Sequence, residues 1–183
     1  NRIDYAASRG IVLALHLFNE PKYECCGSNR WEGNVWNSSN NINSGTPGGS
    51  SGVPNLYDTS NSELMNYEKN YIQTIASAVQ NKWNVILVNG NEITAGINWQ
   101  KQVADWVKEV APNLLYAANS FSGSKEIYGY GNVDIIYYKY DNNTSFNGLT
   151  PSNINGISSQ YGKPVIVHMP DQKCMPEREG TFD

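Results

Sequence analysis

The sequence lacks any apolar run that approaches the roughly 20 residues needed to cross a membrane. Its longest largely apolar run, Ile11–Phe18, has the length of a β-strand. It also lacks a basic stripe, because 13 Lys and Arg and 17 Asp and Glu are interspersed and give a net charge of −4. These absences argue against a membrane or a nucleic acid as partner, and they favour a neutral polar ligand.

Cysteine is scarce as well. The three cysteines, Cys25, Cys26 and Cys174, form no CxxC pattern, and their odd number gives no complete disulfide framework. Unpaired thiols are the simpler interpretation, and a bridge from Cys25 or Cys26 to Cys174 stays open in an oxidising compartment. The glycosylation acceptor patterns at Asn37, Asn142 and Asn143 are consistent with a secreted protein.

The length and the first residues bear on domain organisation. A chain of 183 residues predicts a single domain, 1–183. The first residues show no initiator Met and no signal-peptide pattern, and the spacing of Ile3, Ala6 and Ala7 predicts a helix just before the first strand. We expect the chain to begin partway along a helix, with a segment missing upstream.

Five short β-rich runs recur along the chain, and each is apolar through most of its length. Continuous apolar character predicts strands buried on both faces, as in parallel sheets. The predicted strands are Ile11–Phe18, Asn84–Val88, Leu114–Ala118, Val133–Tyr138 and Pro164–Val167.

Segments with helical periodicity separate these runs. One stripe over Leu64–Val79 contains Leu64, Tyr67, Tyr71, Ile75 and Val79, with Ser62 as the expected N-cap. A second stripe, over Trp99–Val110, contains Trp99, Val103, Trp106, Val107 and Val110. Ser152–Tyr161 predicts a shorter helix, and Gly123–Gly131 has room for one or two turns.

This alternation of strands and helices predicts an α/β fold with a parallel sheet, either doubly wound or closed as a (β/α)8 TIM barrel. The first strand is followed by His16-Leu-Phe-Asn-Glu-Pro, without a GxGxxG or Walker pattern, which favours the barrel over a nucleotide-binding fold. A full barrel needs about 250 residues. The fold class is therefore an incomplete barrel or a fragment, completed by another chain or by a missing segment.

A long loop over 19–61 interrupts the pattern after the first strand. Its stretch Gly27–Ser60 is rich in Gly, Ser and Asn, yet it contains Trp31 and Trp36. Long loops are usually functional or disordered, and barrel active sites are built from the loops that follow strands. We interpret the loop as substrate-binding, with the two tryptophans as platforms for sugar rings or, equally, as packing within the loop.

The sharpest feature is the strand that runs into Asn91-Glu92. A carboxylate at the end of a barrel strand stands where catalysis occurs, and we expect the apolar strand beneath it to raise its pKa, as a general acid requires. The alternative is a Glu that caps the next helix or lies in solvent.

This strand resembles the fourth strand of the clan A glycoside hydrolases, the cellulase- and mannanase-like (β/α)8 enzymes. That clan ends the strand in Asn-Glu, with the Glu as acid/base and the Asn on a sugar hydroxyl. Residues 3–16, 134–140 and 161–167 are similar to the clan's second helix with third strand, sixth strand and seventh strand. The resemblance implies strands three to seven of a glycosidase barrel.

The chain departs from the clan at the end of the seventh strand, where a second catalytic Glu is expected. His168-Met169 stands there instead, and the next carboxylate is Asp171. A glycosidase needs two carboxyl groups. Asp171 is therefore the candidate second catalytic residue, with a plain loop Asp as the alternative.

Other strand ends supply candidate substrate-binding residues. His16, Tyr138, Tyr140 and His168 lie at or near the ends of strands, where one of the two tyrosines should face the pocket. Two histidines without supporting ligands are a weak metal signal, and no cofactor is implied. Trp83, Trp99 and Trp106 are expected in the core.

The sequence thus predicts a glycoside hydrolase acting on a polysaccharide or oligosaccharide. Glu92 and Asp171 are its candidate catalytic residues; Asn91, Trp31, Trp36, His16, Tyr138, Tyr140 and His168 are its candidate substrate-binding residues. The alternative is a catalytically inactive, carbohydrate-binding barrel that lacks the nucleophile.

Overall fold

The computed structural model describes residues 1–20, 32, 37–40, 56–120, 125–139 and 151–168. The strands are β1 (Leu13–Asn19), β2 (Val85–Asn91), β3 (Leu115–Ala118), β4 (Ile135–Lys139) and β5 (Val165–His168). The helices are α1 (Arg2–Ser8), α3 (Ser62–Val79), α4 (Ile97–Val110), the 3-10 helix η2 (Lys125–Gly129) and α5 (Pro151–Tyr161). No helix in these ranges is long and apolar enough to cross a membrane.

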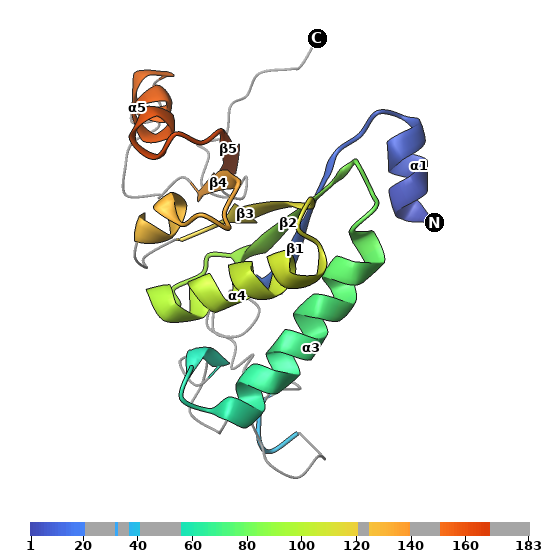
Figure 1. Cartoon of the computed structure of the whole chain (residues 1–183), viewed down its shortest axis with the longest axis vertical. Coiled ribbons are helices and arrows are strands. Elements are labelled where there is room, and N and C mark those ends of the chain that lie inside the picture. Colours follow the sequence, from blue (N-terminus) through green and yellow to red (C-terminus); the bar gives the residue numbers. More distant parts are fainter. Residues whose placement is uncertain (21–31, 33–36, 41–55, 121–124, 140–150, 169–183) are drawn as a thin grey trace, which may run out of the picture.

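The five strands form one parallel sheet in the order β1-β2-β3-β4-β5 (Figure 1). The predicted α/β class and parallel sheet are therefore confirmed. A doubly wound fold reverses its strand order partway along the sheet, and the described strands show no such reversal. With right-handed crossovers, a sequential order places the connecting helices on one face of the sheet.

The two faces of the sheet carry separate apolar clusters. The larger cluster joins α3 and α4 to the side chains that one face of the sheet presents, such as Val85, Leu87 and Tyr116. The smaller cluster, on alternate residues, consists of Ile86, Val88, Ala117, Ile135 and Tyr137, with Ile166 against it. Strand residues are thus buried on both faces, which explains the continuous apolar runs in the sequence.

Helix α3 differs in its details from the sequence prediction. Its N-cap is Asn61 rather than Ser62, because the Asn61 side chain accepts a hydrogen bond from the Leu64 N–H at 3.1 Å. Tyr67 and Tyr71, expected on the buried stripe, are 41% and 39% exposed. The fully buried face is rotated relative to the predicted stripe, and its members are Leu64, Met65, Glu68, Ile72, Ala76 and Val79. The stripe predicted for α4 is confirmed, with Trp99, Val103 and Val107 buried and Trp106 and Val110 partly buried.

The buried face of α3 contains the carboxyl group of Glu68, a residue type that is usually exposed. A pattern of apolar residues alone therefore does not identify this face. Glu68 is fully buried between α3 and α4, and its Oε2 accepts a hydrogen bond from Trp99 Nε1 at 2.7 Å. Its Oε1 has no hydrogen-bond partner among the described residues. Burial raises the pKa of Glu68 from its ordinary value of 4.5 to about 8. The side chain is therefore neutral in the folded protein at pH 7.

We expect Glu68→Gln to become progressively more stable than the wild type as the pH rises from 5 to 8. In that range the unfolded wild type has lost the Glu68 proton and the folded wild type still binds it, since the folded pKa is about 8. The contribution of Glu68 to the free energy of unfolding of the wild type then falls by about 1.4 kcal/mol per pH unit, and the glutamine variant lacks this contribution. Urea unfolding at several pH values measures the difference.

Glu63→Gln is the matched control, since Glu63 is exposed in the first turn of the same helix. Its free energy of unfolding should follow that of the wild type with a small, nearly constant offset. A constant difference between the wild type and Glu68→Gln over the same pH range would contradict the assignment of Glu68.

Candidate active site

The carboxyl ends of β1 and β2 place two Asn-Glu pairs next to each other. Asn91 ends β2 in register with Asn19 of β1, and Asn91 Nδ2 donates to Asn19 Oδ1 at 3.3 Å. Glu20 and Glu92 follow these residues directly. Asn91 Oδ1 is buried and has no hydrogen-bond partner among the described residues. The carboxyl end of the sheet thus combines two carboxyl groups with a buried amide oxygen that has no partner among the described residues.

Glu92 lies in a turn with an unusual backbone conformation. Its φ is +56°. No other non-glycine residue in the described part of the chain has a positive φ. The left-handed region costs an ordinary residue about 1–2 kcal/mol. Such strain persists where neighbouring groups hold the backbone, and it is concentrated at functional sites.

Asn89 and Asn119 hold this turn from the β3 side, and the side chain of Asn89 bonds both backbone groups of Asn119. Asn89 Nδ2 donates to the Asn119 carbonyl oxygen at 2.8 Å, and Asn89 Oδ1 accepts from the Asn119 N–H at 2.7 Å. Asn119 in turn accepts from the Ile93 N–H at 3.3 Å and donates to the Tyr137 carbonyl oxygen at 3.0 Å. Both asparagines are buried. Their side chains therefore continue the hydrogen bonding between β2, β3 and β4 beyond the end of β3.

Glu20 holds the same turn from the β1 side. Its backbone N–H donates to the Asn91 carbonyl oxygen at 3.2 Å. Its carboxylate accepts from the Thr94 N–H at 2.7 Å, from Thr94 Oγ1 at 2.5 Å and from Tyr57 Oη at 2.8 Å. The residues on both sides of Glu92 are thus fixed by Glu20 and Asn119, the residues that directly follow the two neighbouring strands.

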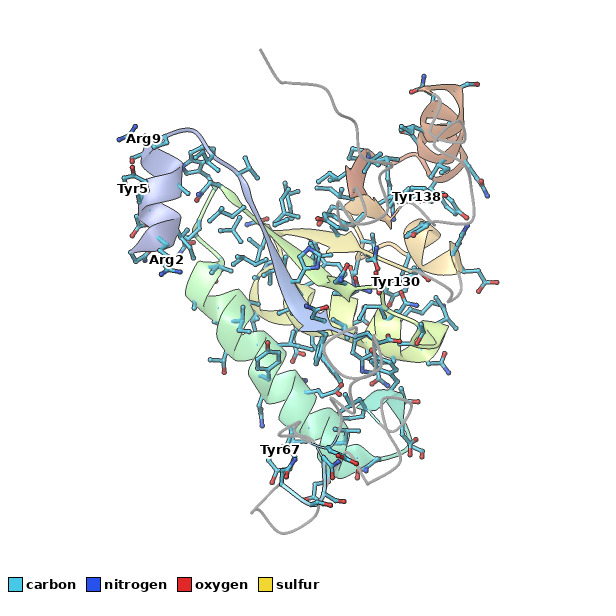
Figure 2. The ribbon with its side chains drawn as sticks, turned by 180° about the vertical axis from the view of Figure 1, so that it is seen from behind. Arg2, Tyr5, Arg9, Tyr67, Tyr130 and Tyr138 are labelled. Atoms are coloured by element: carbon cyan, nitrogen blue, oxygen red, sulfur yellow. The ribbon has the colours of Figure 1, made fainter. Side chains whose placement is uncertain are left out.

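His16 and Tyr137 meet on the sheet face opposite α3 and α4. Their rings make an edge contact, with centroids 5.0 Å apart and planes at 83°. Tyr137 belongs to the smaller apolar cluster, whereas Tyr138 packs against the larger one, with Lys125 Nζ 5.9 Å from its ring centroid. Figure 2 shows Tyr138 on β4. The tyrosine beside His16 is therefore Tyr137, which the sequence prediction did not select.

Of the remaining predicted site residues, the structure describes His168. It ends β5, where its backbone pairs with Lys139 of β4. Trp31, Trp36, Tyr140 and Asp171 lie outside the described residues. Among the side chains that the structure places, no three or more His, Cys, Asp and Glu gather as a metal site.

The sequence prediction did not include Glu20, Asn89 or Asn119. A signal for Glu20 was present, since Asn19-Glu20 repeats the Asn91-Glu92 pattern at the end of a strand. The role of Asn89 and Asn119 had no such signal, because it depends on the register between β2 and β3.

Comparison of the chain with protein-family models and with curated proteins finds no match. The likeness to clan A glycoside hydrolases therefore depends on the strand signatures of this sequence alone.

We expect Gly90→Ala to destabilise the protein by about 1–3 kcal/mol, the usual cost of overpacking. A Cβ atom at position 90 would lie 2.6 Å from the Phe18 carbonyl oxygen and 2.5 Å from Ile93 Cδ1. The Phe18 carbonyl belongs to the backbone of β1, so β1 and β2 would have to separate beside the Asn19 and Asn91 pair. Thermal and urea unfolding measure the loss.

Gly156→Ala is the matched control for this substitution. Gly156 lies within α5, and a Cβ atom there meets no atom within 4 Å. Alanine should stabilise the helix by about 0.5–1 kcal/mol. Equal effects of the two substitutions would show that the close approach at Gly90 does not constrain the strand ends.

Proposed function

We propose that this chain is a glycoside hydrolase-like domain in which Glu92 is the general acid/base, and that its five strands belong to a (β/α)8 barrel. One observation carries the proposal: Glu92 occupies a strained turn at the carboxyl end of a parallel strand, fixed from both sides by neighbouring strands. Barrel enzymes place their catalytic residues at this end of their strands.

The strand arrangement supports a barrel rather than an open sheet. The strands follow one another in sequential order, as they do around a barrel. β2 and β3 lie between β1 and β4, so that a flat sheet would separate β1 from β4 by about 14 Å, three strand spacings. The 5.0 Å contact between the rings of His16 and Tyr137 spans these strands and is favoured by a sheet that curves toward that face.

Glycoside hydrolysis also needs a second carboxyl group. Glu20 supplies one on the neighbouring strand, in addition to Asp171, the residue proposed from sequence. The Glu20 carboxyl group is held by hydrogen bonds from Thr94 and Tyr57, and its oxygens accept all of them. We therefore assign proton transfer to Glu92 and the role of second carboxylate to Glu20.

The proposed chemistry uses the carboxyl group of Glu92 twice. In the first step its proton passes to the glycosidic oxygen, the bond from that oxygen to the anomeric carbon breaks, and a carboxylate oxygen of Glu20 bonds to the anomeric carbon. In the last step the Glu92 carboxylate takes a proton from water, the water oxygen bonds to the anomeric carbon, and the bond from that carbon to Glu20 breaks. His16, which is partly exposed on the concave side of the proposed barrel, is suited to contact a sugar ring, and Tyr137 packs against it.

A carbohydrate-binding barrel without turnover is the second candidate. The observation in its favour is that the strand resembling the clan's seventh strand ends at His168 rather than at a carboxylate. Binding of glycans by the wild type without hydrolysis of any chromogenic glycoside would favour this second function.

We expect Glu92→Gln to lower kcat by about 10²–10⁴-fold, the usual contribution of general acid/base catalysis, with little change in glycan affinity. The amide keeps the shape of the side chain but cannot donate and recover the proton. Hydrolysis of a panel of chromogenic glycosides gives kcat, and calorimetry with the matching oligosaccharides gives Kd.

Two further variants accompany Glu92→Gln in the same assay: Glu20→Gln tests the second carboxylate, and Glu126→Gln is the control. Glu126 is exposed on η2, and its substitution should leave kcat unchanged. Glu20→Gln should also lower kcat, because an amide disturbs the hydrogen bonds from Thr94 as well as removing the second carboxylate. Wild-type turnover in Glu92→Gln, together with loss of activity in Glu20→Gln, would transfer the acid/base role to Glu20.

A further inference from the structure

Trp83 lies where the sequence prediction did not place it. It was expected in the core, but 67% of its surface is exposed, so that expectation is wrong. Trp83 precedes β2, and its side chain therefore lies at the amino end of the sheet, opposite the end that carries Glu92. A tryptophan this exposed leaves a large flat apolar face open to a ligand.

An open groove with a volume of about 220 Å³ runs beside Trp83. Three exposed amide side chains line it, those of Gln80, Asn81 and Asn113. Lys82 also lines the groove, and its Nζ forms an ion pair with Asp4 at 2.6 Å. The groove thus combines one aromatic face with neutral hydrogen-bonding groups, and Lys82, the charged residue among its described lining residues, already has a counterion.

These features match the chemistry of a neutral sugar. A pyranose presents an apolar C–H face that covers an aromatic ring and a rim of hydroxyl groups that amides can bind. An anionic ligand would need an unpaired cation in the lining, and a protein partner would bury about 800 Å² on each side of a standard interface. The small volume suits one or two sugar rings, since pockets for larger ligands measure about 300–1,000 Å³.

We propose that the groove beside Trp83 is a second, non-catalytic binding site for a neutral glycan chain. The seven residues of β2 lie between Trp83 and Glu92, which corresponds to roughly 20 Å along the strand. Binding here holds a polymer on the protein and raises its local concentration at the other end of the sheet. The site does not require hydrolysis at Glu92, so it goes beyond the proposed function.

NMR spectra that resolve the indole N–H signals of the five tryptophans test the proposal directly. Trp83→Phe identifies the Trp83 signal by its loss, and Glu92→Gln protein is then titrated with cellohexaose, mannohexaose and laminarihexaose. We expect the Trp83 signal to shift in a saturable manner with at least one hexaose. Trp83→Ala should weaken binding to the corresponding soluble polysaccharide at least fivefold in affinity electrophoresis, and it should leave hydrolysis of a small chromogenic glycoside unchanged.

Tyr67→Ala is the matched control, because Tyr67 is exposed on α3 at the end of the helix distant from Gln80 (Figure 2). It should bind the polysaccharide like the wild type. A Trp83 signal that no hexaose shifts would overturn the proposal, as would one that shifts with protein concentration alone, since the groove would then be a contact between copies. If the Trp83 signal shifts but no glycoside is hydrolysed, the glycan site stands and the proposed function fails.

Discussion

The reciprocal hydrogen bonds between Asn89 and Asn119 are the constraint on which the candidate active site depends. β3 ends at Ala118, so the backbone N–H and C=O of Asn119 have left the regular sheet in a region where they remain buried. The amide of Asn89 satisfies both groups. A buried group that loses its partner costs about 1–3 kcal/mol, so all members of this arrangement are held together. The conformation beside Glu92 is therefore set by the side chains of Asn89 and Asn119, together with Glu20 on the β1 side.

The helical layer supports the same end of the sheet. Trp99 of α4 donates to buried Glu68 and contacts the rings of Phe18 and Tyr57 at centroid distances of 5.2 and 4.7 Å. Tyr57 in turn donates to Glu20. Helix packing and the strand ends are thus connected through one tryptophan. A neutral Glu68 is compatible with this packing, whereas an ionised one would carry a buried charge without a counterion among the described residues.

The sequence predicted the elements better than their contacts. All five strands and the helices between them begin within two residues of the predicted positions. This agreement is expected because continuous apolar runs and helical stripes depend only on local periodicity. Glu68 and Trp83 reverse the usual preference, one being a buried carboxyl group and the other an exposed aromatic ring. Periodicity cannot identify such exceptions. The location of Glu92 at a strand end was predicted, but its φ of +56° depends on contacts with Asn119 and Glu20 that are distant in sequence.

The strain at Glu92 bears on the choice between a hydrolase and a binding barrel. A turn that only connects β2 to α4 could use glycine at this position and avoid the left-handed cost of about 1–2 kcal/mol. Glutamate is present instead, and hydrogen bonds from both neighbouring strands hold the residues around it. A binding surface needs hydrogen-bonding groups, which asparagine could provide there with less strain. A carboxyl group in a fixed position is needed when a proton must be transferred to a particular atom, and this requirement favours the catalytic interpretation.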